Sequence, residues 1–136
     1  TLHENVARVP LLVAAPGYVA GKTTALTELM DLHPTLSQLA GLDVSATAQG
    51  KSLVPVLQNP NQQVRKAALT VGRKGHLLRS ENWAYMRYQD GSEELYDMQN
   101  DIMQFDNLAE DSKYLEILQE QQMALEAHLR TYELSE

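Results

Sequence analysis

The hydrophobic pattern changes to a period of two at Ala67, and this change constrains the fold more than any other feature. Four short alternating segments follow, AALTVGR, HLLRSE, WAYMRY and EELYDM, separated by Lys74-Gly75, Glu81-Asn82 and Gln89-Asp90-Gly91-Ser92. Alternation is typical of strands, and an Asp-Gly pair favours a tight hairpin. The pattern predicts an antiparallel four-stranded meander, in which Trp83 and Tyr85 pack in the core or across strands.

The end of the chain, residues 112–134, carries apolar residues at helical spacing: Leu115, Leu118, Met123, Leu125, Leu129 and Tyr132. Such a stripe predicts an amphipathic helix that covers one face of the sheet. The predicted fold class is therefore α+β, a four-stranded antiparallel sheet packed by a C-terminal helix.

The first half reads differently. The run VPLLVAA, residues 9–15, ends at Pro16-Gly17 and predicts a strand buried on both faces. No other segment offers it a parallel partner, so we expect its neighbours to precede Thr1 in a longer protein. Residues 31–40 predict a helix, with Asp31 as a possible cap and Gly41 at its C-terminal end. A short helical turn is expected around residues 53–57.

The stretch APGYVAGKTT, residues 15–24, invites comparison with a phosphate-binding loop. Counting back from Gly21-Lys22-Thr23 places Pro16 where that loop requires its first Gly. Proline has a fixed φ and no N–H to donate. A nucleotide-binding loop is therefore not expected here.

Charge is unevenly distributed along the 136 residues. Residues 1–89 hold nine Lys and Arg against five Asp and Glu, whereas residues 90–136 hold two against thirteen. The basic stretch includes Arg73, Lys74, His76 and Arg79 and could attract an anionic ligand. The charge cluster alone favours the alternative, a pair of basic strands packing beside an acidic helix. The net charge of −7 and the lack of a recognised motif argue against a nucleic-acid partner, and no apolar run is long enough for a membrane span.

The residues alone present no catalytic constellation. Cysteine is absent, which excludes disulfides, zinc–thiolate sites and a Cys nucleophile, and the histidines at 3, 33, 76 and 128 lack metal-pair spacing. The acidic stretch QNDIMQFDNLAEDS lacks the ligand alternation of a calcium loop. We therefore expect no catalytic or metal-binding residue in this segment.

Five segments in order carry a resemblance: RVPLLVAAPG, LMDLHPTLSQLAGL, GKSLVPVLQNP, GHLLRSENWAYMRYQDGSEELYDMQND and DNLAED. This order resembles the C-terminal part of a type I, formylglycine-dependent sulfatase. It is most similar to bacterial enzymes grouped with iduronate-2-sulfatase. The sequence departs from the family pattern at Ile102, where a Pro is usual, and near Gln104, where a Glu is usual.

The resemblance implies how the chain fits into a longer protein. Residues 1–64 would contain a strand and helix that end the alkaline-phosphatase-like α/β domain, with their connection, and residues 65–136 would form the C-terminal subdomain. The formylglycine nucleophile and the calcium ligands would lie upstream, as would an active-site Lys just before Thr1. Export to the periplasm, the cell exterior or the lysosome is the family habit, although the compartment stays open.

The expected function is that of a sulfatase fragment, inactive alone, whose parent hydrolyses sulfate esters of glycans. Its partners would be the N-terminal domain of that parent and a sulfated sugar. Arg73, Lys74, His76 and Arg79 are candidates for a cationic substrate rim. The alternative is a non-catalytic structural or binding module derived from the sulfatase fold. Without its sheet neighbours, the apolar run at residues 9–15 predicts dimerisation or disorder of the isolated segment.

Overall fold

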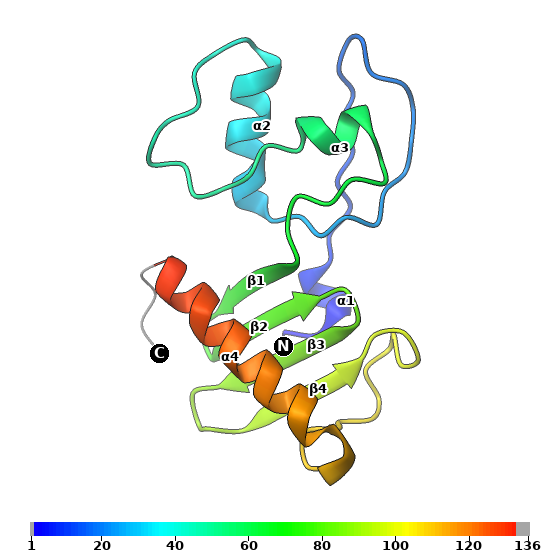
Figure 1. The fold of residues 1–136 in the computed structure, drawn as a ribbon, viewed down its shortest axis with the longest axis vertical. Coiled ribbons are helices and arrows are strands. Elements are labelled where there is room, and N and C mark those ends of the chain that lie inside the picture. The colour runs from blue at the N-terminus through cyan, green and yellow to red at the C-terminus, as the bar shows by residue number, and fades with distance from the viewer. Residues whose placement is uncertain (1, 133–136) are drawn as a thin grey trace. The chain divides into compact units, whose positions relative to one another are not determined.

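The computed structural model describes residues 2–132, which divide into two compact units (Figure 1). One unit comprises Pro10–Ala68. The other combines the start of the chain, up to Val9, with the part that begins at Leu69. The predicted division of the longer protein at residue 64 stays a prediction.

The sheet consists of four strands in the order β1-β2-β3-β4. They are β1 (Ala67–Gly72), β2 (Gly75–Ser80), β3 (Trp83–Tyr88) and β4 (Glu93–Asp97). β2 pairs with β3, and β3 with β4, in antiparallel registers that bring Leu78 opposite Tyr85 and Tyr85 opposite Leu95. Gly91 adopts a φ of 84° in the last hairpin, a conformation that L side chains rarely take. The predicted meander is confirmed.

One face of the sheet packs against α4 (Leu115–Thr131), which follows the 3₁₀ turn η2 (Ser112–Tyr114) (Figure 1). The side chains buried between them include Leu78, Tyr85, Leu95, Leu125 and Leu129. Polar contacts join the two layers at their edges. The predicted C-terminal helix is therefore confirmed over most of its range, while residues 133 and 134 lie outside the described residues.

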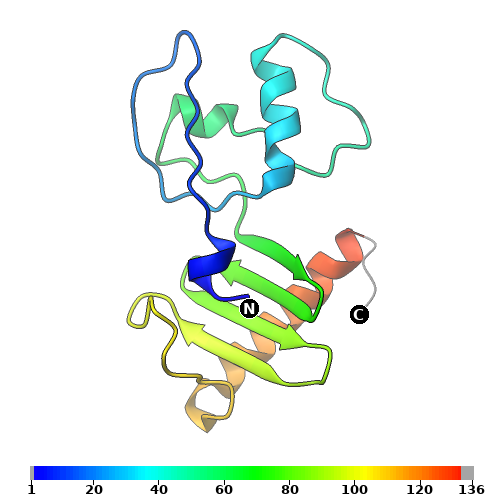
Figure 2. The same ribbon diagram turned by 180° about the vertical axis from the view of Figure 1, so that it is seen from behind.

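The opposite face packs against the start of the chain, where the short helix α1 (Glu4–Ala7) crosses the sheet (Figure 2). Leu2, Leu77, Ala84, Met86, Tyr96 and Met98 form its buried core. Because side chains alternate along a strand, β2 sends Leu77 to this face and Leu78 to the α4 face. The sheet is thus covered on both sides, and Tyr85 is fully buried as the pattern predicts.

The unit Pro10–Ala68 contains the 3₁₀ turn η1 (Leu29–Asp31) and two helices, α2 (Leu32–Leu39) and α3 (Val54–Gln58). Both helices were predicted to within a few residues. Gly41 follows α2 with a φ of 69°, as expected for its C-terminal position. Within residues 2–132, no helix combines the length and apolarity needed to cross a membrane.

The predicted strand at residues 9–15 is not formed in this structure. The segment is extended backbone without a strand assignment, and Leu12 is 90% exposed. A strand exists only when a neighbour shares its hydrogen bonds. Residues 2–132 supply no such neighbour, so the segment keeps a strand-like sequence without the sheet.

Candidate functional site

The four candidate rim residues do not form one surface. Arg73 and Lys74 occupy the turn between β1 and β2, and both are exposed. His76 and Arg79 lie on β2 three residues apart. Since successive side chains alternate between faces, these two point to opposite sides of the sheet. The structure therefore leaves only the turn pair, Arg73 and Lys74, as neighbouring exposed cations.

His76 lies on the α4 side, opposite Arg87 of β3 in the strand register. Burial and the positive charge of Arg87 lower the pKa of His76, and the carboxylate of Glu126 only partly opposes them. A lowered pKa keeps the imidazole neutral at physiological pH. His76 consequently contributes no cation to a rim at that pH.

Arg79 lies on the α1 side and is already paired. Its Nε donates to Glu4 Oε2 at 3.2 Å, and its guanidinium also donates to the backbone oxygens of Ser80 and Glu81. The side chain of Arg79 is 19% exposed. It holds α1 against the sheet, and the charge is balanced by Glu4.

The structure reveals a pocket that the sequence did not predict. It is an open depression of about 460 Å³. One wall is the chain start, with His3, Glu4, Asn5 and Arg8, and the other is the loop after β4, with Ile102, Met103 and Gln104. We call this the α1 pocket. Its volume falls within the range of small-ligand sites. The two walls are about 100 residues apart in sequence, so no local pattern indicated that they meet.

Gln104 joins the two walls of the α1 pocket. Its Oε1 accepts the backbone N–H of Glu4 at 2.6 Å, and only 7% of the residue is exposed. Its Nε2 is buried and has no hydrogen-bond partner among the described residues. Gln104 also has a φ of 59°, a left-handed conformation uncommon for a residue other than Gly, Asn or Asp. Residues in such backbone conformations are common at active sites and ligand-binding loops.

The charges around the α1 pocket are unequally matched. Glu4 is neutralised by Arg79, as described above. His3 Nε2 lies 3.5 Å from Glu94 Oε2, and Glu94 also accepts a hydrogen bond at 3.2 Å from Tyr96. By contrast, Arg8 is exposed and forms no salt bridge within residues 2–132. The pocket therefore presents one unpaired cation and one anion that is already paired.

Glu94 accepts hydrogen bonds from two tyrosines and also lies beside His3. Tyr88 and Tyr96 each donate a hydroxyl to Glu94 Oε2 at 3.2 Å. Burial and the nearby carboxylate raise the pKa of Tyr88 to about 12. The same causes, in the same order, raise the pKa of Tyr96. Both phenols stay protonated, and the ring of Tyr96 lies 5.7 Å from that of His3.

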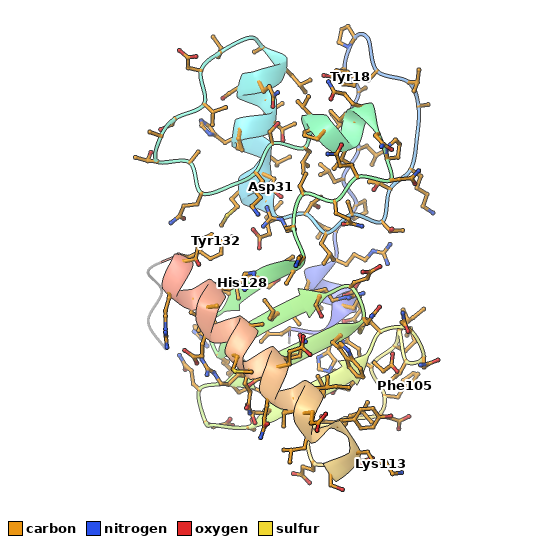
Figure 3. The ribbon with its side chains drawn as sticks, viewed as in Figure 1. Tyr18, Asp31, Phe105, Lys113, His128 and Tyr132 are labelled. Carbon is orange, nitrogen blue, oxygen red and sulfur yellow. The ribbon has the colours of Figure 1, made fainter. Side chains whose placement is uncertain are left out.

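The second unit holds a buried ionic cluster rather than an open site. Asp31, labelled in Figure 3 at the start of α2, is fully buried. Its carboxylate accepts the backbone N–H groups of Glu28 at 2.8 Å and Lys51 at 2.7 Å. The guanidinium of Arg65 donates to the carboxylates of both Glu28 and Asp31. Asp31 thus caps the preceding turn η1 instead of α2.

The same cluster explains two of the sequence segments that carry the family resemblance. Asp31 and Thr35 belong to LMDLHPTL, and Gly50 to Leu53 begin the stretch before α3. A Cβ on Gly50 would lie 2.0 Å from the carbonyl oxygen of Met30, so only glycine allows this approach. These residues hold two backbone segments together.

The stretch around Gly21 and Lys22 forms an irregular loop. Gly17 has a φ of 86° at the turn, and residues 23–28, directly after Lys22, are not helical. Thr23 donates its hydroxyl to the carbonyl of Pro60 at 2.7 Å instead of facing a ligand. The absence of a helix N-terminus behind the loop supports the exclusion of a nucleotide-binding loop.

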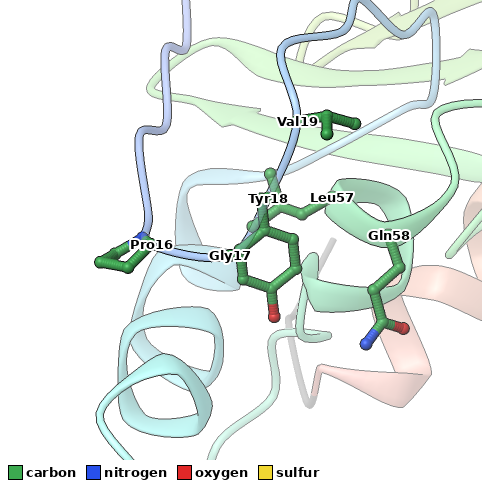
Figure 4. Close-up of a pocket in the computed structure, with 6 residues that line it drawn as sticks. All are labelled: Pro16, Gly17, Tyr18, Val19, Leu57 and Gln58. Carbon is green, nitrogen blue, oxygen red and sulfur yellow. The ribbon is translucent and has the colours of Figure 1, made fainter.

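A second depression lies beside this loop (Figure 4). Pro16, Gly17, Tyr18, Val19, Leu57 and Gln58 line it. No charged side chain is among them, and the polar side chains of the lining are the phenol of Tyr18 and the amide of Gln58. Across residues 2–132, no group of three or more His, Asp and Glu side chains could hold a metal ion.

Comparison with known proteins places these observations in a family. The chain matches the family described as N-sulphoglucosamine sulphohydrolase, C-terminal, over residues 1–131. A sulfatase of Formosa agariphila is 34% identical over 115 residues, covering 83% of this chain and 23% of that protein. The delta 4,5-hexuronate-2-O-sulfatase of Bacteroides thetaiotaomicron is 33% identical over 143 residues, covering 95% of this chain and 30% of that protein.

A solved structure is similar as well. It contains a protein in complex with its substrate D-glucosamine-2-N,6-O-disulfate, and it superimposes with a TM-score of 0.70 at 26% identity. The match covers 76% of this chain and 24% of that one. The chain thus spans about a quarter to a third of the proteins it matches.

Proposed function

Since this chain belongs to the C-terminal family of N-sulphoglucosamine sulphohydrolase, we propose that it forms the C-terminal part of an active sulfatase. The reaction is hydrolysis of a sulfate ester, in which water is added across the ester to release an alcohol and inorganic sulfate. The observation that carries the proposal is the family match across residues 1–131. The four-stranded meander and the C-terminal helix, both predicted from the sequence and present in the structure, support it.

We propose that the substrate is a sulfated glycan, and more specifically a 2-O-sulfated uronic acid, as in iduronate-2-sulfatase. Two relatives support a sulfated glycan, and one of them supports a uronate. One is named a hexuronate-2-O-sulfatase, and one solved neighbour holds a sulfated glucosamine. The first shares 33% of its aligned residues with this chain, which favours uronate over glucosamine.

We propose that calcium and the formylglycine nucleophile are held by other parts of the longer protein. Within residues 2–132, no group of three or more metal-ligating side chains gathers that could hold such an ion, which supports this proposal. Cysteine, a precursor of formylglycine, is also absent from the sequence. We therefore assign no reaction step to the residues of this chain, and give it a role in shaping the substrate cleft.

The exposed apolar segment, residues 9–15, also has a proposed partner in the longer protein. We propose that residues 9–15 pair with strands of the N-terminal domain in the longer protein. The exposed fractions of Val9, Leu11 and Leu12 are 58%, 45% and 90%, a large apolar area for water to contact. In the isolated chain, two copies could pair through this segment, so we expect a dimer there.

A substrate panel tests the proposed function. The full-length protein is incubated with three compounds: a disaccharide sulfated at O2 of its uronate, one sulfated at O6 of its glucosamine, and a phosphonate monoester. We expect sulfate release to be fastest from the first. Preference for the phosphonate would contradict the proposal, and one solved structure, a phosphonate monoester hydrolase that is 25% identical to this chain, makes that comparison necessary.

A further inference from the structure

We infer that the α1 pocket is a binding subsite for an acidic sugar residue of the substrate, with Arg8 as the cation that recognises its carboxylate or sulfate. This inference rests on the proposed function and extends it to a particular place on the chain. Nothing in the family match assigns a role to this pocket. The geometry of its two walls supports the inference in three ways.

Electrostatics favours an anionic ligand. Arg8 is exposed at the end of α1, where its backbone N–H caps the helix by donating to Glu4 O at 2.9 Å. The one carboxylate in the pocket lining, that of Glu4, already pairs with Arg79. A carboxylate or sulfate that enters the pocket can therefore bind the guanidinium of Arg8, and the charge of Glu4, neutralised by Arg79, repels it little. Arginine suits such groups because its planar donors match two anionic oxygens.

The rest of the lining matches a sugar rather than a bare anion. The side chains of Ile102 and Met103 form an apolar wall, and they are 60% and 66% exposed. An apolar wall can pack against the C–H face of a sugar ring and lose its contact with water. Asn5 also lines the pocket, and its exposed amide can hydrogen-bond hydroxyl groups of a sugar. A site with an apolar wall and polar groups favours a ligand such as a sugar, which has an apolar C–H face and hydroxyl groups.

Gln104 supplies the third observation. Its amide Nε2 is a buried donor without a partner among the described residues, in a residue that lines the pocket. A buried donor left unpaired is costly, and a ligand oxygen would remove that cost. Its Oε1 meanwhile fixes α1 to the loop through Glu4 N. Gln104 thus positions the two walls and adds an unsatisfied amide donor to the lining.

The test is an NMR titration of the 136-residue protein with a 2-O-sulfated uronate–glucosamine disaccharide. Saturable shifts are expected at the amides of residues 3–8 and 102–104. Arg8→Ala should weaken binding roughly tenfold, the size expected for losing one charge-assisted contact. Arg8→Lys should restore part of the affinity. Gln104→Glu should also weaken binding, since it keeps the acceptor for Glu4 N–H but removes the donor.

Arg130→Ala is the matched control, because Arg130 is an exposed arginine on α4, at the other face of the sheet. Its affinity should equal that of the unaltered protein. Absence of saturable shifts would overturn the inference. So would equal weakening by Arg8→Ala and Arg130→Ala, or identical shifts at the same concentration of inorganic sulfate alone.

Sulfate release by the full-length protein separates the two proposals. If the disaccharide binds at the α1 pocket but the full-length protein releases no sulfate from any ester, the proposed function fails and the pocket remains. If sulfate is released normally by the Arg8→Ala protein at low disaccharide concentration, the subsite fails and the function remains. An aryl sulfate, which lacks the sugar, should be hydrolysed equally well by both proteins.

Discussion

The hydroxyl of Thr35 accepts the backbone N–H of Leu53 at 2.8 Å, joining α2 to the segment that leads into α3. The same hydroxyl donates to the carbonyl oxygen of Asp31 at 2.6 Å. Thr35 is 1% exposed, so neither backbone group could turn to water instead. The Thr35 side chain thus joins two of the segments that carry the family resemblance, and its role is to stabilise the fold.

Removing that hydroxyl should destabilise the unit Pro10–Ala68. Thr35→Val keeps the side-chain shape and leaves the Leu53 N–H buried without a partner, a loss of about 1–3 kcal/mol. Thr35→Ser keeps the hydroxyl and should retain most of the stability. Hydrogen exchange at the Leu53 amide measures the difference. Equal protection in the two variants would show that the bond contributes nothing.

Shortening Leu125 should destabilise the packing of α4 on the sheet. Leu125 is fully buried, and Leu→Ala in a well-packed core costs about 2–5 kcal/mol. Met123, on the same helix, is 67% exposed, and Met123→Ala should change stability by no more than about 0.5 kcal/mol. Urea unfolding followed by the fluorescence of Trp83, the only tryptophan, reports both variants. A large effect of Met123→Ala with none of Leu125→Ala would contradict the packing described.

Stability should depend on pH through His76. Its pKa is lowered in the folded state, so the unfolded chain binds the proton more readily as pH falls through the ordinary value of about 6.5. The unfolded state is therefore favoured at low pH, and stability should fall between pH 7.5 and the lowered pKa. His76→Gln should reduce this slope. An unchanged slope in unfolding measurements at pH 7.5, 6.5 and 5.5 would rule out this role.

Reversing the charge of the turn tests the remaining rim hypothesis. In the full-length protein, Arg73→Glu combined with Lys74→Glu should lower kcat/KM for a sulfated disaccharide several-fold and weaken its dependence on salt, because steering of an anion is lost. Arg130→Glu, in α4, is the control. Unchanged kcat/KM and salt dependence would mean that the turn is an ordinary solvated surface.

The strands and the long helix could be read from the sequence because their signals are local. Alternation and the Asp90-Gly91 turn fix each hairpin, and the apolar stripe of α4 requires a sheet face to cover it. The strand predicted at residues 9–15 is absent because the prediction used only the local pattern. That pattern is typical of a strand, but a strand also needs a neighbour to share its hydrogen bonds.

The candidate site depends on contacts between distant residues, which the sequence alone did not reveal. Arg79 belongs to a basic stretch in the sequence, yet it pairs with Glu4, 75 residues away. The α1 pocket forms because Gln104 reaches Glu4 across 100 residues. In the sequence alone, the basic stretch looked like one surface. In the structure, His76 and Arg79 point to opposite faces of the sheet, and Arg73 and Lys74 lie in the turn before β2.

The most direct test of the central claim compares the 136-residue chain with the full-length protein on an aryl sulfate in the presence of calcium. We predict that the full-length protein releases sulfate and that the chain alone does not. Turnover by the chain alone would contradict this assignment, because a nucleophile would then lie within these residues. Failure of the full-length protein on both aryl and sugar sulfates would contradict the sulfatase function itself.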